Sequence, residues 1–243
     1  MRLAEPTAVG QTAPGLRLLA LSLVLVVYGN LASLLIGGGV PAAGWPGVLV
    51  GLLLIAAMLL WAARVGHLGP RELGLQPHGL AGSAGWGLLV ALATGLAAVL
   101  FLRFPPLLAG PVVYAPLSQA SAATLLWRIE VWMPLDTVLP EELAFRGVLL
   151  ASLMRRLPIV RAALASAGVF TLWHAVIVTR TLAQTILRSE PVFLALGFVG
   201  AFGAIFVGAL LFATLRIRTR HLAGSMLAHW AFNSLLLVGL ARS

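Results

Sequence analysis

Residues 139–146 read Leu-Pro-Glu-Glu-Leu-Ala-Phe-Arg and place Glu141, Glu142 and Arg146 in an otherwise apolar part of the chain. On a helix, Glu142 and Arg146 are four residues apart and share one face, so they can form an ion pair. Glu141 is rotated by about 100° around the helix and can point elsewhere. Ionisable groups inside a membrane are expensive and mark functional sites. The stretch therefore predicts one paired glutamate and one glutamate free for chemistry; a charge cluster at a helix end is the structural alternative.

The composition around this stretch is that of a polytopic membrane protein. The 243 residues are 60% hydrophobic and 9% charged, whereas a soluble domain is about 25% charged. Apolar runs long enough to cross a bilayer occur at residues 16–36, 47–63, 83–102, 159–178, 191–215 and 222–240. We therefore expect an all-α fold, a transmembrane helix bundle of seven to eight spans with the active site in a polar intramembrane cavity.

Proline and glycine divide the chain into segments. We expect a flexible N-terminal tail at residues 1–15, N-terminal transmembrane helices at 16–102, a loop or re-entrant segment at 103–121, and a catalytic helical core at 122–243. In that core, Pro140 suits the first turn of a new half-helix, which would leave the two glutamates near its positive end and open to water. Small residues between Gly197 and Gly208 predict close helix packing there.

The charges and the missing cysteines restrict topology and partners. The basic residues are all arginine, and with a cytoplasmic N-terminus ten of them fall in inner connections and five in outer ones. This bias predicts an integral protein, expected in a bacterial cytoplasmic membrane, with its N-terminus in the cytoplasm. The net charge of +9 indicates contact with the lipid bilayer, not with nucleic acid. The absence of cysteine excludes disulfides and thiolate metal ligands, and the oligomeric state stays open.

Three further polar residues lie inside apolar runs. His174 falls in the run at 159–178, and His229 and Asn233 lie four residues apart in the run at 222–240. Each is costly if it faces lipid, so the cheapest arrangement gathers all three around one cavity with the glutamates. Separately satisfied hydrogen bonds between helices are the structural alternative. The other histidines, His67, His78 and His221, lie in polar connections, and we expect them to be solvated.

Glutamate, histidine and asparagine together suit hydrolysis of an acyl bond. A carboxylate with a histidine can activate water as a general base, and a second histidine and an amide can stabilise an oxyanion. Alternatively, Glu141, His174 and His229 could hold a divalent metal such as zinc with an open position for water. No zincin motif, cysteine nucleophile or Gly-rich phosphate loop competes with these readings.

The order Glu141-Glu142-x-x-x-Arg146, Phe170-x-x-x-His174, His229-x-x-x-Asn233 resembles the CAAX protease and bacteriocin-processing (CPBP, or Abi) family over residues 120–240. This family of intramembrane endopeptidases includes the type II prenyl-protein protease. The segment Arg71-Glu72-Leu73-Gly74-Leu75 resembles a further feature of the family.

The resemblance implies a role for each motif residue. Glu141 and His174 would activate the attacking water, and His229 and Asn233 would stabilise the oxyanion. Glu142, Arg146 and Phe170 would support the site. The substrate would be a peptide or lipidated protein, prenylated and CAAX-like or bacteriocin-like, and the cofactor stays undecided between none and zinc.

Two functions from other classes use the same residues. A catalytically silent scaffold or immunity protein could bind a partner through the polar cavity. A small transporter could relay protons through the carboxylates, but the chain has no inverted repeat that would favour one.

Overall fold

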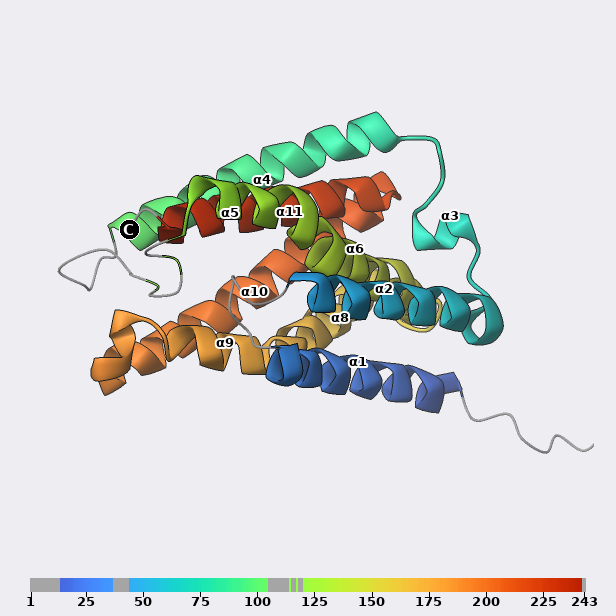
Figure 1. The fold of residues 1–243 in the computed structure, drawn as a ribbon. Coiled ribbons are helices and arrows are strands. Elements are labelled where there is room, and N and C mark those ends of the chain that lie inside the picture. Colours follow the sequence, from blue (N-terminus) through green and yellow to red (C-terminus); the bar gives the residue numbers. More distant parts are fainter. Residues whose placement is uncertain (1–13, 37–43, 105–113, 115–116, 118–119, 242–243) are drawn as a thin grey trace, which may run out of the picture.

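The protein folds as a bundle of helices (Figure 1). The computed structural model describes residues 14–36, 44–104, 114, 117 and 120–241. Within these residues the only β-type pairing is an isolated bridge between Tyr114 and Thr185. The predicted all-α fold is therefore confirmed.

The first half of the chain forms three long helices and a short one. They are α1 (Pro14–Ile36), α2 (Gly44–Trp61) with the π-helical turn η1 (Ala62–Gly66), α3 (Pro70–Leu73) and α4 (Leu80–Arg103). Most of the predicted loop at 103–121 and of the predicted tail at 1–15 lies outside the described residues.

The second half begins with a segmented helix at residues 122–154. Its pieces are α5 (Ala122–Trp127), η3 (Arg128–Val138), α6 (Leu139–Glu142), η4 (Leu143–Leu149) and α7 (Leu150–Met154). There follow α8 (Ile159–Trp173), α9 (Ala175–Leu182), the 3₁₀ turn η5 (Ile186–Ser189), α10 (Pro191–Thr219) and α11 (Leu222–Ala241).

Five of the described helices are long and apolar enough to cross a membrane, or six if α8 and α9, which are bent by 48°, form one span. The segmented helix at 122–154 is a further helical pass through the bundle, so the architecture is roughly that predicted. The run at 159–178 was expected to be unbroken, but it breaks at His174. Leucines exposed along α1, α2 and α4, such as Leu23, Leu53 and Leu96, suit contact with lipid.

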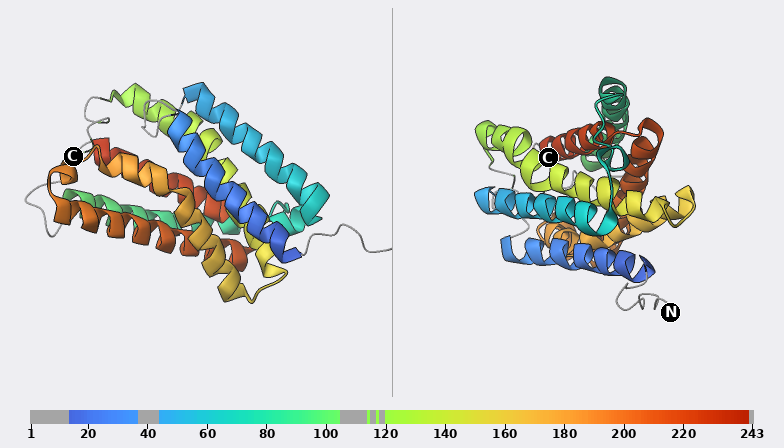
Figure 2. Two further views of the ribbon diagram at one scale, coloured as in Figure 1. Left: turned by 90° about the horizontal axis from the view of Figure 1, so that it is seen from below. Right: turned by 90° about the vertical axis from the view of Figure 1, so that its right-hand side faces the viewer.

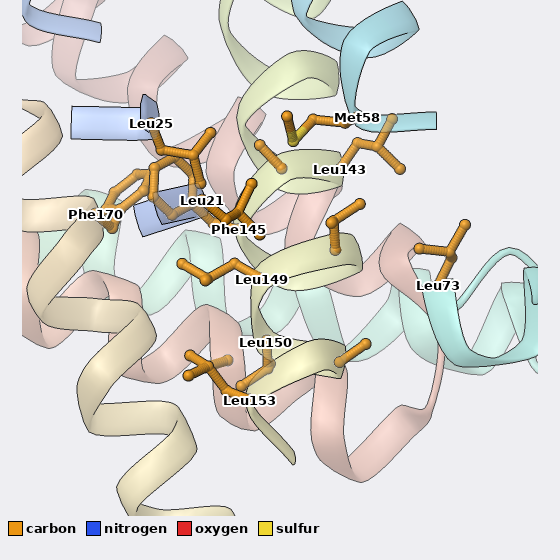
Figure 3. Packing of buried hydrophobic residues seen from close by; sticks show 14 of the residues in the cluster. Leu21, Leu25, Met58, Leu73, Leu143, Phe145, Leu149, Leu150, Leu153 and Phe170 are labelled. Atoms are coloured by element: carbon orange, nitrogen blue, oxygen red, sulfur yellow. The ribbon is translucent and has the colours of Figure 1, made fainter. Parts of the chain in front are cut away.

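The segmented helix lies at the centre of the bundle. In Figure 1 and in the right-hand view of Figure 2, α1 and α4 occupy opposite edges, with residues 122–154 between them. Every residue from Glu141 to Leu153 is buried, as expected for a helix surrounded by protein on all sides. Figure 3 shows Phe145 of this helix beside Leu21 and Leu25 of α1 and Phe170 of α8. Leu149, Leu150 and Leu153 follow along the same helix and belong to the same buried cluster. The charged stretch thus lies in the most buried helix.

The expected half-helix beginning at Pro140 is not what the structure contains. Val138 and Leu139 already have right-handed helical dihedrals, so no free helix N-terminus faces Glu141. Pro134 lies within the π-helical stretch η3, and Pro140 lies in the short α-helical piece α6 that follows it without a break, so the helix continues past both prolines. The prediction that a positive helix end would lie beside the glutamates was therefore wrong.

Helices of the bundle approach one another closely at glycine residues, and one such contact fixes the place of the central helix. A Cβ at Gly51 of α2 would lie 2.5 Å from the carbonyl oxygen of Leu135 and 2.9 Å from Cγ of Pro140. Only glycine therefore lets α2 approach the helix directly before the glutamates. Similarly, a Cβ at Gly224 of α11 would lie 2.6 Å from the carbonyl oxygen of Ser83 in α4. A Cβ at Gly200, Gly203 or Gly208 would meet nothing, so the packing predicted along α10 at these positions is absent.

Candidate active site

Glu142 and Arg146 form the predicted ion pair, and it is completely buried. Nη1 of Arg146 donates to Oε1 of Glu142 at 2.9 Å, and the two side chains are 1% and 0% exposed. His229, from α11, donates from Nδ1 to the same Oε1 at 3.0 Å. One carboxylate oxygen thus fixes both a cation on its own helix and an imidazole from another helix.

Aromatic rings enclose the guanidinium of Arg146. Its Cζ lies 4.1 Å from the centroid of the Phe170 ring and 5.2 Å from that of Phe212. Phe212 also stacks on His229 with centroids 5.2 Å apart. These contacts exclude water and fix both side chains, because a cation over an aromatic face is attracted to it. Phe170, predicted as a supporting residue, is 4% exposed and lies against this cation.

Glu141 lies beside this network without an ion pair to arginine. Nε1 of Trp173 donates to its Oε1 at 3.2 Å, whereas its Oε2 is buried and has no hydrogen-bond partner among the described residues. Oε2 lies 3.8 Å from Nε2 of His174 and 3.9 Å from Nε2 of His229. The structure therefore brings the predicted residues Glu141, His174 and His229 together around one carboxylate oxygen.

His174 occupies the break between α8 and α9. Its backbone dihedrals, φ −90° and ψ 5°, interrupt the helix, and its Nδ1 donates to the carbonyl oxygen of Phe170 at 2.8 Å. Asn30 of α1 satisfies the backbone groups that the break releases. Its Nδ2 donates to the carbonyl of Leu172 at 2.9 Å, and its Oδ1 accepts from the N–H of Val176 at 2.8 Å. The break is thus braced by another helix, and this fixes where the imidazole lies.

These hydrogen bonds determine which histidine nitrogens carry protons. A carbonyl oxygen can only accept, so Nδ1 of His174 must be protonated; the carboxylate of Glu142 requires the same of Nδ1 of His229. In the neutral rings, both Nε2 atoms are then acceptors. They face Oε2 of Glu141, so three acceptors converge without a donor between them. A water molecule can donate to two of them, and the pattern therefore suits an activated water.

His229, which was predicted to stabilise an oxyanion, can do so only in one protonation state. Since Nδ1 of His229 is already protonated, Nε2 can donate to an oxyanion only when the ring carries a second proton. The carboxylates of Glu141 and Glu142, at 3.9 Å and 3.0 Å, are the groups that would stabilise this cation. Asn233 lies one helical turn beyond His229 on α11, is half-buried and has no hydrogen bond within the described residues. Its amide is therefore available as a donor.

The three converging atoms do not lie at metal-binding spacing. Ligands of a tetrahedral zinc ion, bound at about 2.0–2.2 Å, are about 3.4 Å apart. The separations from Glu141 to the two histidines are 3.8 and 3.9 Å, and no group of three such side chains among the described residues meets the geometry of a metal site. A metal held by Glu141, His174 and His229 would require these side chains to move closer together.

The remaining histidines lie outside the site. His67 and His78 are exposed, as predicted. His221, which we expected to be solvated, is 8% exposed, and its Nδ1 accepts from the N–H of Ala223 at 2.9 Å. That expectation was wrong because His221 caps the first turn of α11, where free backbone N–H groups need an acceptor.

The sequence motifs did not point to Trp173, although it adjoins His174. Its ring stacks on Tyr28 and meets Phe145 edge-on, at centroid distances of 5.9 and 5.3 Å. The indole is thereby fixed with its N–H toward Glu141, and one carboxylate oxygen is held while the other stays free. A tryptophan donor beside a buried glutamate is visible only once the helices are packed.

Replacing Trp173 by Phe tests this positioning. The variant keeps an aromatic ring against Tyr28 and Phe145 but removes the donor to Glu141. A hydrogen bond to a charged group contributes about 1.5–3 kcal/mol, so we expect kcat for the hydrolysis that the sequence motifs predict to fall roughly tenfold or more with KM unchanged. Trp127→Phe, at an exposed position of α5, is the matched control. An unchanged kcat in Trp173→Phe would show that Glu141 needs no such donor.

A protein-family model matches the part of the chain that contains the three motifs. Residues 123–235 match the family described as type II CAAX prenyl endopeptidase Rce1-like. The matched region begins in α5, ends in α11 and includes Glu141, His174, His229 and Asn233. No curated protein and no solved structure matches the chain. The family resemblance seen in the sequence is thus confirmed.

Proposed function

We propose that this membrane protein hydrolyses a peptide bond of a membrane-associated substrate, because residues 123–235 match the family described as type II CAAX prenyl endopeptidase Rce1-like. The substrate class is a prenylated, CAAX-like or bacteriocin-like peptide or protein. The attacking water would be activated by Glu141 and His174, without a covalent intermediate on the enzyme.

One observation carries this proposal: a buried carboxylate oxygen without a partner faces two imidazole nitrogens. Oε2 of Glu141 is 3.8 Å from Nε2 of His174 and 3.9 Å from Nε2 of His229. An unsatisfied acceptor in a buried place is destabilising unless a donor comes to it. A water molecule between these atoms would satisfy it and would be polarised toward attack.

The proposed reaction moves one proton from water to the leaving amine. Glu141, with His174 as hydrogen-bond partner of the same water, takes a proton as the water oxygen attacks the substrate carbonyl carbon. The carbonyl oxygen becomes an oxyanion, which the Asn233 amide and the doubly protonated His229 would stabilise. Collapse of the intermediate breaks the carbon–nitrogen bond, and Glu141 returns the proton to the amine nitrogen.

No step of this proposal uses a metal ion, because Glu141 lies too far from His174 and His229 in this structure for the three to bind one ion together. His174 and His229 each use Nδ1 for a fixed acceptor and direct Nε2 inward, an arrangement that metal ligands also show. If zinc is required, Glu141, His174 and His229 are the residues that would hold it. Removal of divalent ions by a chelator distinguishes the two cases.

We also propose that the N-terminus lies in the cytoplasm. The connections between α2 and α4, between α7 and α8, and between α10 and α11 would then be cytoplasmic. The first two hold arginines 64, 71, 155 and 156. Arginines 216, 218 and 220 lie at the end of α10 and directly after it, on the same side. This agrees with the excess of basic residues on the inner side of membranes.

The proposal is tested with purified protein in lipid nanodiscs and a quenched fluorescent peptide ending in a prenylated CAAX sequence. We expect cleavage, with mass spectrometry finding two fragments that together contain one added water. An unprenylated peptide and a bacteriocin-like leader peptide define the substrate class. Turnover retained with chelator favours the metal-free route, and turnover lost with chelator and restored by zinc favours the metal route. Cleavage of none of these peptides would favour the scaffold alternative.

A further inference from the structure

A polar pocket lies beside α3, at the end of the bundle away from the start of α5 (Figure 1). It is partly open to solvent and has a volume of about 310 Å³, and its polar lining consists of Arg71, Glu72, Gln76, Arg155, Arg216 and Arg220. These residues come from α3 and the turn after it, from the residue after α7, and from the end of α10 and the residue after it. In the proposed topology, this is the cytoplasmic headgroup level of the membrane.

The one carboxylate that lines this pocket is already neutralised. Nε of Arg155 donates to Oε1 of Glu72 at 2.8 Å, and the N–H of Gly69 donates to Oε2 at 3.0 Å. The hydrogen bond from Gly69, followed by that from Arg155, lowers the pKa of Glu72, so it stays ionised at neutral pH. Arg155 in turn donates to the carbonyls of Gly66 and His67. Arginines 71, 216 and 220 are left without an ion pair among the described residues.

Arg216 is the residue that indicates a ligand. It is 4% exposed, and its Nη2 donates to the carbonyl oxygen of Glu72 at 2.6 Å. Its Nε is buried and has no hydrogen-bond partner among the described residues. Gly74, with φ +76°, makes room for the guanidinium: a Cβ at this position would lie 2.7 Å from Cζ of Arg216. A cation buried without an anion is costly, so the pocket lacks its counter-charge.

We propose that this pocket binds the phosphate group of an anionic ligand, and that the ligand is the headgroup of an acidic phospholipid. Guanidinium groups bind phosphate oxygens through paired, charge-assisted hydrogen bonds, and the pocket is lined by such groups from α3 (Arg71) and from the end of α10 (Arg216 and Arg220). Free phosphate shares this chemistry. The position of the pocket where the long apolar helix α10 ends favours a lipid, because basic groups at that level meet acidic headgroups.

The experiment is thermal unfolding of the full-length protein in a neutral detergent, titrated with short-chain phosphatidylglycerol, short-chain phosphatidylcholine or inorganic phosphate. We expect saturable stabilisation by phosphatidylglycerol and none by phosphatidylcholine. The double variant Arg71→Gln/Arg220→Gln changes two exposed side chains, and we expect it to bind the lipid about tenfold more weakly, as for the loss of charge-assisted hydrogen bonds. Arg218→Gln, an exposed arginine between Arg216 and Arg220 that does not line the pocket, is the matched control.

The outcomes separate the sources of the anion. Saturable stabilisation by inorganic phosphate that equals that by phosphatidylglycerol would support the phosphate pocket but overturn the assignment to lipid. Equal binding by the double variant and the wild type would overturn the pocket itself. An equal loss in Arg218→Gln would also overturn it, because diffuse surface charge would then explain the binding. The readout requires no cleavage, so it is independent of the proposed peptidase activity.

Discussion

Glu141→Gln is expected to lower kcat for cleavage of the prenylated peptide by about 10²–10⁴-fold, the range for loss of a general base. The substitution keeps the shape of the side chain, and its carbonyl oxygen can still accept the hydrogen bond from Trp173. What it removes is the acceptor at the position of Oε2, where the proton of the attacking water would go. Measurement of initial rates under saturating substrate gives the result directly.

The same substitution should leave the fold as stable as the wild type, or more stable. The amide nitrogen of glutamine would replace Oε2 and could donate to Nε2 of His174 and of His229, which are now 3.8 and 3.9 Å from that atom. It would satisfy a buried polar position that has no partner among the described residues and remove a buried charge. A melting temperature at or above that of the wild type is therefore expected in Glu141→Gln.

Glu130→Gln is the control for loss of a carboxylate from the same segmented helix, because Glu130 is exposed in η3. It should cleave the peptide at the wild-type rate. If Glu141→Gln also retained that rate, Glu141 would not be the base. A large loss of melting temperature together with activity would show instead that Glu141 acts mainly in folding.

The sequence was sufficient to predict the features that depend on composition and on the spacing of neighbouring residues. Long apolar runs and scarce charge led to a helical membrane bundle, and the spacing of Glu142 and Arg146 led to their buried ion pair. Glu141, His174 and His229 were expected to share one cavity, because a polar side chain facing lipid is costly; they do meet, from three helices. Their catalytic roles stay predictions.

The features that the sequence did not reveal depend on contacts between distant helices. The break at His174 is stabilised by Asn30, which lies far away in the chain, and the donor to Glu141 comes from Trp173, whose ring is fixed by Tyr28. Local rules for proline predicted a helix start at Pro140, but the residues before it are already helical and the helix continues through Pro140 within the packed bundle. The spacing of glycines in α10 permitted close packing, but the structure has it only at Gly197, where a Cβ would lie 3.1 Å from Leu187, because close approach depends on which element lies opposite.

Arg146→Met is expected to destabilise the protein by about 3–5 kcal/mol, the cost of leaving a buried charge without its partner. Glu142 is 0% exposed, and Arg146 is the only arginine that forms an ion pair with it among the described residues. Methionine would fill much of the space between Phe170 and Phe212, so the loss reports the missing charge more than a cavity. A lower melting temperature in detergent, followed by tryptophan fluorescence, is the measurement.

The double variant Glu142→Gln/Arg146→Met separates the charge from the packing. Removing both charges of a buried pair is often nearly neutral for stability, and the glutamine carbonyl can still accept from Nδ1 of His229. We therefore expect most of the lost melting temperature to return. Activity should return less, because His229 would lose the carboxylate that stabilises its doubly protonated form. Arg156→Met, at an exposed position, controls for loss of an arginine. If the double variant were as unstable as Arg146→Met, packing by the arginine, and not neutralisation of Glu142, would be its structural role.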